Sequence, residues 1–523
     1  MKQLLTAAAL ALATALPAAQ AQTLTVAKSG DAPHFDGHRA GWSAAADVVN
    51  LVQDTLVALD WDGRTPIPLL AKSWTVSPDG KLYTFKLRDD VQFCSGKKFT
   101  AADVIYSFNR QKDPATRAPY AWRAGKIKDL RAPDPYTVEY ELNEPYSDLL
   151  LQLTMYNNAI HNKDSVEQWG KDYGLKGLDG TGPWCFESWR PRTETVLKRH
   201  DAYKWGPSMY KNPGPVKFEK MVIKIIPEDS SRLAGMLSGA FDLTTQFPLQ
   251  FIDQAKKSPM LQVSQANPNF QFTMFAFRMK DRPLVADKRV REAMNLALNR
   301  KELVQGVMLG QGEPAYTYVH PNARDFAPST KGIVKEDVAR ANKLLDEAGW
   351  TQRDKDGIRM KDGVRLAPKA VIPNLTFYPR MSEAMQGYFR KIGIDWQIIA
   401  VDVSTMVGRL GADDYDMWTV TVPYMSAGEL MTFYFDSANI PVPNRLFWKD
   451  EITDAGLKEG RTAIDDATRM RGYAKVQERV MNEHLMLPIK NINMYMTSNK
   501  RIKNARAHML FQQTIYKGLD LSL

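Results

Sequence analysis

The segment from His34 to His38 contains side chains of the types that most often hold metal ions. Two imidazoles, His34 and His38, flank the carboxylate of Asp36 within a short stretch of the chain. Imidazole and carboxylate groups are common ligands of zinc and other transition metals, but a structural zinc site usually needs about four ligands. The spacing of the sequence identifies no further ligand for this segment. We therefore assign no metal ligands.

Several common motifs of enzyme active sites are absent from the sequence. The sequence has no Gly-x-Ser-x-Gly nucleophile turn, no His-Glu-x-x-His zinc helix and no phosphate-binding loop of the Walker type. Abundant serines and acidic residues do not replace such motifs. We therefore assign no catalytic residues and no cofactor, and we expect a protein that is not an enzyme, with an exported hydrolase as the minor alternative.

Composition and charge narrow the class of partner. The chain has 523 residues, of which 44% are hydrophobic and 24% charged, and its formal net charge is +10. Its basic residues are scattered, with only short pairs such as Lys97-Lys98 and Lys256-Lys257. Proteins that bind nucleic acid usually concentrate such residues on one face. We expect a large globular protein of two or three lobes that does not bind nucleic acid.

The first twenty-one residues are typical of a secretion signal. Lys2 precedes the apolar run 4–16, and Ala19 and Ala21 place small residues where a signal peptidase cuts. A membrane-spanning helix needs about 20 apolar residues, more than this run provides. We expect residues 1–21 to be a signal peptide removed after Ala21. Because the next residue is Gln22 and not cysteine, we expect no lipid anchor.

The elements that would position a site are clearest between residues 70 and 110. Ser77-Pro78-Asp79-Gly80 has the residues of a tight turn, and 82–87 alternates apolar and polar residues as a half-buried strand does. A second turn is expected at Ser95-Gly96, after a strand that contains Cys94. Thr100 and Asp103 then form a capping pattern, which predicts a helix over 101–110.

Residues 70–110 resemble the signature of the bacterial extracellular solute-binding proteins of family 5, the peptide and nickel class that serves ABC importers. Other segments extend this resemblance. They are LDGTGPWCFESW (178–189), PLVADKRVREAMNLALNR (283–300), a helix with Val338, Ala341, Leu345 and Ala348 on one face that stops at Gly349, and a helical stripe of Met381, Met385, Phe389 and Ile392 before Gly393-Ile394.

The resemblance implies an α/β protein with the two-lobed fold of type II periplasmic binding proteins and an extra inserted subdomain. We expect a discontinuous first lobe at 22–60, 185–271 and 490–523, with the inserted subdomain at 61–184. The second lobe is expected at 272–489. Chain crossings near 270–273 and 487–491 would act as the hinge. The expected protein is a periplasmic monomer that works with an ABC permease and its ATPase.

The two cysteines, Cys94 and Cys185, both fall in what the resemblance makes one lobe. An exported protein meets an oxidising compartment that permits disulfides. We expect these two residues to be bonded, which in the chain-entropy model stabilises by roughly 4 to 5 kcal/mol. The alternative is a pair of buried free thiols.

The resemblance also places candidate ligand residues. In the peptide-binding branch of the family, an aspartate pairs with the amino terminus of the peptide, and Pro423 aligns with that position. A buried ammonium without a carboxylate partner is costly. This argues against ordinary peptides in the usual register and favours a peptide-like, opine-like or related solute without that ammonium. A metal chelate such as nickel or haem is the alternative cargo.

Seven residues are candidate ligand contacts. Arg380, just before the helix of Met381, aligns with an arginine that holds the ligand carboxylate in dipeptide-binding relatives, a task that suits a guanidinium; a salt bridge on the surface or between the lobes is the alternative. Phe272, Trp418 and Tyr424 are candidate apolar walls, because small-ligand clefts are often lined by aromatic side chains; core packing is the alternative for each. Weaker candidates are Tyr156, Asn157 and Trp42.

Overall fold

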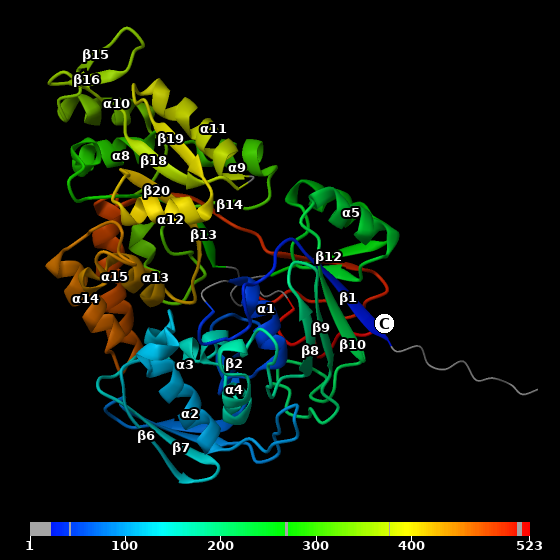
Figure 1. Cartoon of the computed structure of the whole chain (residues 1–523). Coiled ribbons are helices and arrows are strands. Elements are labelled where there is room, and N and C mark those ends of the chain that lie inside the picture. The colour runs from blue at the N-terminus through cyan, green and yellow to red at the C-terminus, as the bar shows by residue number, and fades with distance from the viewer. Residues whose placement is uncertain (1–21, 41–42, 267–269, 376, 510–514) are drawn as a thin grey trace, which may run out of the picture.

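The computed structural model describes residues 22–40, 43–266, 270–375, 377–509 and 515–523. The expected signal peptide and Trp42 lie outside these residues. The described chain contains sheets of seven, six, four, three and two strands, with helices packed on the larger ones (Figure 1). No helix among these residues is long and apolar enough to cross a membrane.

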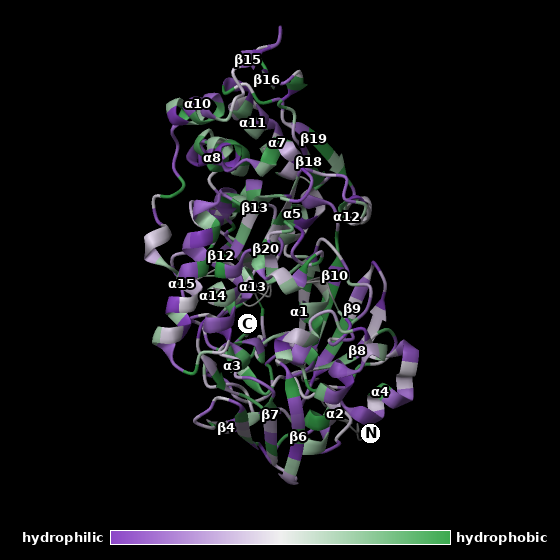
Figure 2. Cartoon of the chain, turned by 90° about the vertical axis from the view of Figure 1, so that its left-hand side faces the viewer, coloured by the Kyte–Doolittle hydropathy of each residue, from purple (hydrophilic) through white to green (hydrophobic). Residues whose placement is uncertain are grey.

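A seven-stranded sheet gathers segments from distant parts of the chain. β1 is its central strand, parallel to both β10 and β11, and the other pairings are antiparallel. Strands β8 to β10 carry hydrophobic stretches in Figure 2. In sheet order the strands are β12 (Leu261–Gln265), β22 (Tyr495–Asn499), β11 (Leu243–Thr244), β1 (Thr23–Lys28), β10 (Lys220–Ile225), β9 (Glu194–Arg199) and β8 (Trp184–Arg190). Helix α1 (Ser43–Val52) follows β1 along the chain, α5 (Asp229–Ser238) connects β10 to β11, and α6 (Ile252–Lys257) connects β11 to β12.

A six-stranded sheet forms the second large core. Every residue of its strand β13 (Gln271–Phe277) is buried, as expected for a strand covered on both faces. β13 lies between β20 (Met417–Pro423) and β21 (Met486–Asn491). The remaining strands are β14 (Glu313–Pro314), β18 (Lys369–Pro373) and β19 (Gln397–Val401). The accompanying helices are α7 (Pro283–Ala286), α8 (Lys288–Leu296), α9 (Arg300–Met308), α10 (Val338–Glu347), α11 (Phe377–Lys391), α12 (Val403–Gly411), α13 (Ala427–Phe435), α14 (Glu451–Arg461) and α15 (Asp466–Asn482).

The region between residues 57 and 184 contains a four-stranded antiparallel sheet in the lower part of Figure 1. Its order is β4 (Ala71–Val76), β5 (Leu82–Leu87), β7 (Thr137–Leu142) and β6 (Ile127–Asp134). Helix α2 (Ala101–Lys112) packs beside β6 and β7, and β2 (Val57–Leu59), β3 (Pro66–Pro68), α3 (Leu149–Gln152) and α4 (Lys163–Trp169) complete the region. A separate small sheet joins β15 (Gln352–Arg353), β16 (Arg359–Lys361) and β17 (Val364–Arg365).

Several local expectations are confirmed. β5 buries Tyr83, Phe85 and Leu87 on one face. Helix α2 begins after Thr100, whose backbone N–H donates to the Asp103 carboxylate at 2.9 Å, so the capping pattern is real. The helix continues two residues beyond the expected end, to Lys112.

Other local expectations are wrong. Cys94 does not lie in a strand but within a tight turn, in which the Gly96 N–H donates to the Phe93 carbonyl at 2.8 Å. Val338 is 38% exposed and does not share the buried face of α10, because it is the first residue of the helix after its Asp337 cap. Arg380 lies inside α11, which starts at Phe377, and not before the helix.

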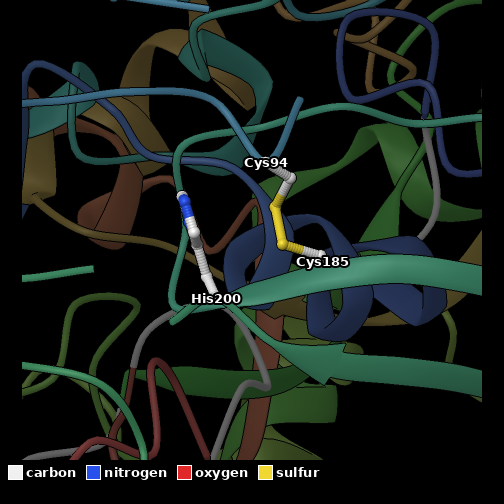
Figure 3. A group of neighbouring side chains, drawn as sticks. All are labelled: Cys94, Cys185 and His200. Carbon is white, nitrogen blue, oxygen red and sulfur yellow. A yellow bond between two sulfur atoms is a disulfide. The ribbon is translucent and has the colours of Figure 1, made fainter. Parts of the chain in front are cut away.

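The expected disulfide is confirmed. Cys94 and Cys185 are bonded, with their Cα atoms 5.7 Å apart (Figure 3). The bond ties the turn that follows the four-stranded region's strand β5 to strand β8 of the seven-stranded sheet. It therefore joins two parts of the fold with separate sheets.

Candidate functional site

The first candidate site is a cavity of about 520 Å³ beside strand β20, which we call the β20 cavity. Strand β20 contributes residues 418–423 as one wall, and α13 contributes Glu429, Phe433 and Tyr434. Tyr120 and Arg123 come from the region of the four-stranded sheet. The cavity thus lies between two parts of the chain that have separate sheets. Such junctions are common places for small-molecule sites.

A short hydrogen-bond chain fixes one wall of the β20 cavity. The Tyr378 hydroxyl donates to Thr421 Oγ1 at 2.9 Å, and Thr421 Oγ1 lies 2.8 Å from Thr273 Oγ1 on the neighbouring strand β13. Burial raises the pKa of Tyr378, so the phenol stays neutral near physiological pH. This wall is therefore polar at a few fixed points and otherwise apolar.

The carboxylate of Glu429 is held by three groups at the edge of the same cavity. Arg123 Nη2 donates to Glu429 Oε1 at 2.6 Å, and both side chains are buried. The Met425 N–H and Gln152 Nε2 donate to Glu429 Oε2 at 2.8 and 3.2 Å. Ser426 caps α13 by accepting from the Glu429 N–H, which positions the carboxylate at the start of the helix. The ion pair links the four-stranded region to the six-stranded part.

A larger cavity of about 710 Å³ is lined by other residues of the first turn of α11, and we call it the hinge cavity because Gln271, at one of the expected chain crossings, also lines it. Phe377 and Arg380 line it from α11, and Gln246 lines it from the segment after β11. Residues 492–495, where the chain passes from β21 to β22, form another wall. The cavity is therefore bounded by both large sheets.

Lys490 lies beside the hinge cavity and is almost completely buried. Its Nζ is 3.2 Å from Met308 Sδ and 4.1 Å from the centre of the Phe377 ring, and both of these neighbours line the cavity. Burial lowers the pKa of Lys490 to about 7. The Met308 sulfur and the Phe377 ring replace only a small part of the hydration energy that the Lys490 ammonium loses on burial.

A third cavity of about 600 Å³ shares Tyr120, Glu429 and Phe433 with the β20 cavity and continues toward α14. Tyr146, Asp148 and other residues of the four-stranded region form its opposite wall. A ligand longer than the β20 cavity would find space in this direction.

The ligand contacts predicted from the sequence lie in different places in the structure. Trp418 and Tyr424 both line the β20 cavity, whereas Arg380 lines the hinge cavity. Phe272 is fully buried and lines neither cavity, because its side chain packs near Tyr318 in the hydrophobic core. The three aromatic candidates, Phe272, Trp418 and Tyr424, therefore do not form one continuous surface.

Two further candidates serve local structure. Tyr156 and Asn157 are fully buried, and both donate to the carbonyl of Ala40, at 3.3 and 3.0 Å. They hold the segment that precedes residues 41–42 and line neither cavity. Trp42 lies outside the described residues.

The segment of His34, Asp36 and His38 has partners of its own. Arg110 binds both oxygens of Asp36, with its Nη2 2.6 Å from Oδ2. His38 Nε2 donates to the Ala159 carbonyl at 3.2 Å, and burial lowers the pKa of His38 to about 3. Both carboxylate oxygens of Asp36, which a metal ion would need, thus already accept hydrogen bonds from Arg110.

Sequence reasoning missed Tyr378, Thr421, Arg123 and Glu429. The Ser426-x-x-Glu429 pattern is a helix-start signal that could have placed Glu429, but nothing local indicates its partner Arg123. The two lie 306 positions apart in the chain. Only the tertiary fold brings them together.

The chain is similar to known proteins both in sequence and in fold. Residues 65–440 match the family described as bacterial extracellular solute-binding proteins, family 5. The nickel-binding periplasmic protein of Escherichia coli K12 is 28% identical over 473 residues, which cover 87% of this chain and 86% of that protein. The glutathione-binding protein GsiB of the same strain is 26% identical over 493 residues, 92% of each chain. The structure of NikA from Brucella suis in complex with Fe(III)-EDTA has a TM-score of 0.82 at 24% identity, over 96% of this chain and 99% of that one.

Proposed function

This chain belongs to the bacterial extracellular solute-binding proteins of family 5, and from that premise we propose the kind of solute that it carries. As a member of the family it has the type II periplasmic-binding-protein fold, captures a small organic solute and delivers it to an ABC permease with its ATPase. The proposed cargo is a peptide-like or opine-like compound that lacks a free ammonium group. It occupies the β20 cavity and is enclosed by closure of the two lobes.

One observation carries the proposal. Glu429 is the one carboxylate among the described residues that line the β20 cavity, and Arg123, Gln152 and the Met425 N–H already bind it. A cargo ammonium in this cavity would be desolvated without an available anion, which is costly. Pro423 on the β20 wall offers no charge either. The cavity is instead suited to apolar and neutral polar groups.

Two side chains supply specific contacts to such a cargo. The Trp418 indole N–H has no hydrogen-bond acceptor within the described chain, and Trp418 lines the cavity. Thr421 is held in place by Tyr378, so its hydroxyl has a fixed direction. Because this N–H is buried in the structure, the Trp418 ring must turn toward the cavity before a cargo carbonyl can accept from it. Arg380 lines the hinge cavity, apart from this cargo, and is proposed as the partner of a carboxylate that binds in that cavity.

The lobes that close on the cargo are proposed with the boundaries expected from the sequence. The first lobe comprises 22–60, 185–271 and 490–523 with the inserted subdomain 61–184, and the second lobe comprises 272–489. We further propose that the protein is a monomer without catalytic activity and is exported after cleavage following Ala21. Intact-mass measurement of the periplasmic protein tests that cleavage, because a mature chain starting at Gln22 has one defined mass.

Native mass spectrometry of protein purified without refolding tests the cargo. A retained compound without a free amino group supports the proposal, and its loss from Trp418→Ala but not from a Trp122→Ala control places it in the β20 cavity. Trp122 is a matched control because it lines the third cavity only. A retained peptide with a free amino terminus, or release of a chemically changed cargo, contradicts it.

A further inference from the structure

Three potential metal ligands cluster around the disulfide, away from the cavities described above. Cys94, Cys185 and His200 each offer one ligand atom, and these atoms lie within 4.8 Å of one another (Figure 3). Cys185 is on β8 opposite Lys198 of β9, and His200 comes two residues after Lys198, directly past the end of β9. Because alternate residues of a strand share a face, Cys185 and His200 lie on the same side of the sheet.

The imidazole of His200 is oriented as a metal-binding histidine is. Its Nδ1 lies 2.9 Å from the Gly182 carbonyl, which can only accept, so Nδ1 carries the proton. Nε2 then has a free lone pair, and it is buried without a hydrogen-bond partner in the described chain. Histidines that bind metals usually donate their other ring N–H to a carbonyl or carboxylate in this way. The ring is only 4% exposed and is fixed by an edge contact with Trp205, at 5.5 Å between ring centres.

We propose that opening of the disulfide creates a binding site for a thiophilic cation, Zn²⁺ or Cu⁺, formed by Cys94, Cys185 and His200. The opening is an exchange with a dithiol. The dithiol gives up two electrons and two protons and becomes a disulfide, while the S–S bond breaks and Cys94 and Cys185 become thiols. Cation binding then displaces the two thiol protons to solvent, because only thiolates are ligands.

The backbone around the cluster allows this change without refolding. The Cα atoms of the two cysteines are 5.7 Å apart, and two thiolates on one zinc ion would be about 3.8 Å apart for Zn–S bonds of about 2.3 Å. Rotation about the Cα–Cβ bonds separates the sulfurs once the bond is open. Cys94 stays anchored by its N–H, which donates to the Gly180 carbonyl at 2.9 Å.

The cation would take over the connection that the disulfide makes. Cys94 comes from the four-stranded region, whereas Cys185 and His200 belong to the seven-stranded sheet. Two thiolates and one imidazole suit Cu⁺ as a three-coordinate site, and Zn²⁺ with a water molecule as the fourth ligand. Both cations would hold the two parts together while the cysteines are reduced.

Cobalt spectroscopy tests the site. Full-length protein is reduced on an immobilised dithiol resin, filtered under argon and titrated with Co²⁺, with the unreduced protein alongside. We expect the reduced protein to bind one Co²⁺ with thiolate-to-cobalt absorption, and the oxidised protein to show none. Displacement by Zn²⁺, and a separate competition for Cu⁺ against a colorimetric chelator, distinguish the two cations.

Variants separate this site from chance binding to two thiols. His200→Gln should weaken Co²⁺ binding at least tenfold, the double variant Cys94→Ser/Cys185→Ser should lose the thiolate absorption, and His34→Gln should bind as the wild type does. Circular dichroism of the reduced protein records whether it stays folded. Absence of thiolate absorption in the reduced protein, or equal affinity in His200→Gln, as binding to an unfolded chain would give, overturns the proposal.

Discussion

Substitution of Lys490 by methionine removes a buried positive charge beside the hinge cavity while keeping a side chain of similar length. In the native protein the Lys490 ammonium contacts Met308 Sδ and the face of Phe377, and the residue is 1% exposed. No ionisable group contributes to its pKa shift, which burial alone causes. The substitution should therefore stabilise the protein, and by an amount that depends on pH.

The magnitude follows from the pKa of Lys490, which is about 7 in the folded protein and 10.5 ordinarily. Between these values the unfolded chain binds more protons than the folded one, so wild-type stability rises as pH rises. Burial of Lys490, as an ammonium at pH 6 and as a neutral amine at pH 9, costs about 4.7 kcal/mol at pH 6 and about 2 kcal/mol at pH 9. Lys490→Met lacks this cost at both pH values.

Urea unfolding at pH 6 and pH 9 measures the effect. The advantage of Lys490→Met over the wild type should shrink by about 2.7 kcal/mol from pH 6 to pH 9. Any change in packing contributes equally at both pH values and cancels in that difference. Lys171→Met, at an exposed position, is the matched control and should show no such change. An advantage that is the same at both pH values would refute the assignment of a largely desolvated ammonium.

Two further predictions concern the connections between parts of the fold. Glu429→Gln should cost about 3 to 5 kcal/mol in the free energy of unfolding, because it leaves the buried Arg123 guanidinium opposite a neutral amide. Glu459→Gln, at an exposed ion pair, should cost less than about 1 kcal/mol, and equal losses would contradict the reasoning. The double variant Cys94→Ser/Cys185→Ser should lose about 4 to 5 kcal/mol, because the cysteines are 91 positions apart. Unchanged urea midpoints would exclude this role of the disulfide.

Much of the local structure could be predicted from the sequence. The alternation over β5 and the Thr100–Asp103 capping pattern depend on neighbouring residues, so a single sequence contains the necessary information. The errors occurred at element ends. The sequence places Arg380 before α11 and Cys94 in a strand, and both predictions are wrong, because turn and helix-start signals fix a boundary only to within a few residues.

The candidate site was less predictable. Trp418 and Tyr424 are close in sequence and line one cavity, whereas Arg380 lines another. Phe272 has the same apolar character as the wall residues but packs in the hydrophobic core. An aromatic side chain in a strand does not reveal whether a protein neighbour or a ligand covers it.

The sequence by itself determined the family and much of the local strand and helix pattern, because these depend on short-range order. It predicted the bond between Cys94 and Cys185 but left free thiols as the alternative, and the structure confirmed the bond. The tertiary structure decided which residues share a cavity. It brings Arg123 to Glu429, and Lys490 to Phe377, across long stretches of chain. The physical reason is that burial and charge pairing depend on distances in space, and local preferences do not encode the packing that sets those distances.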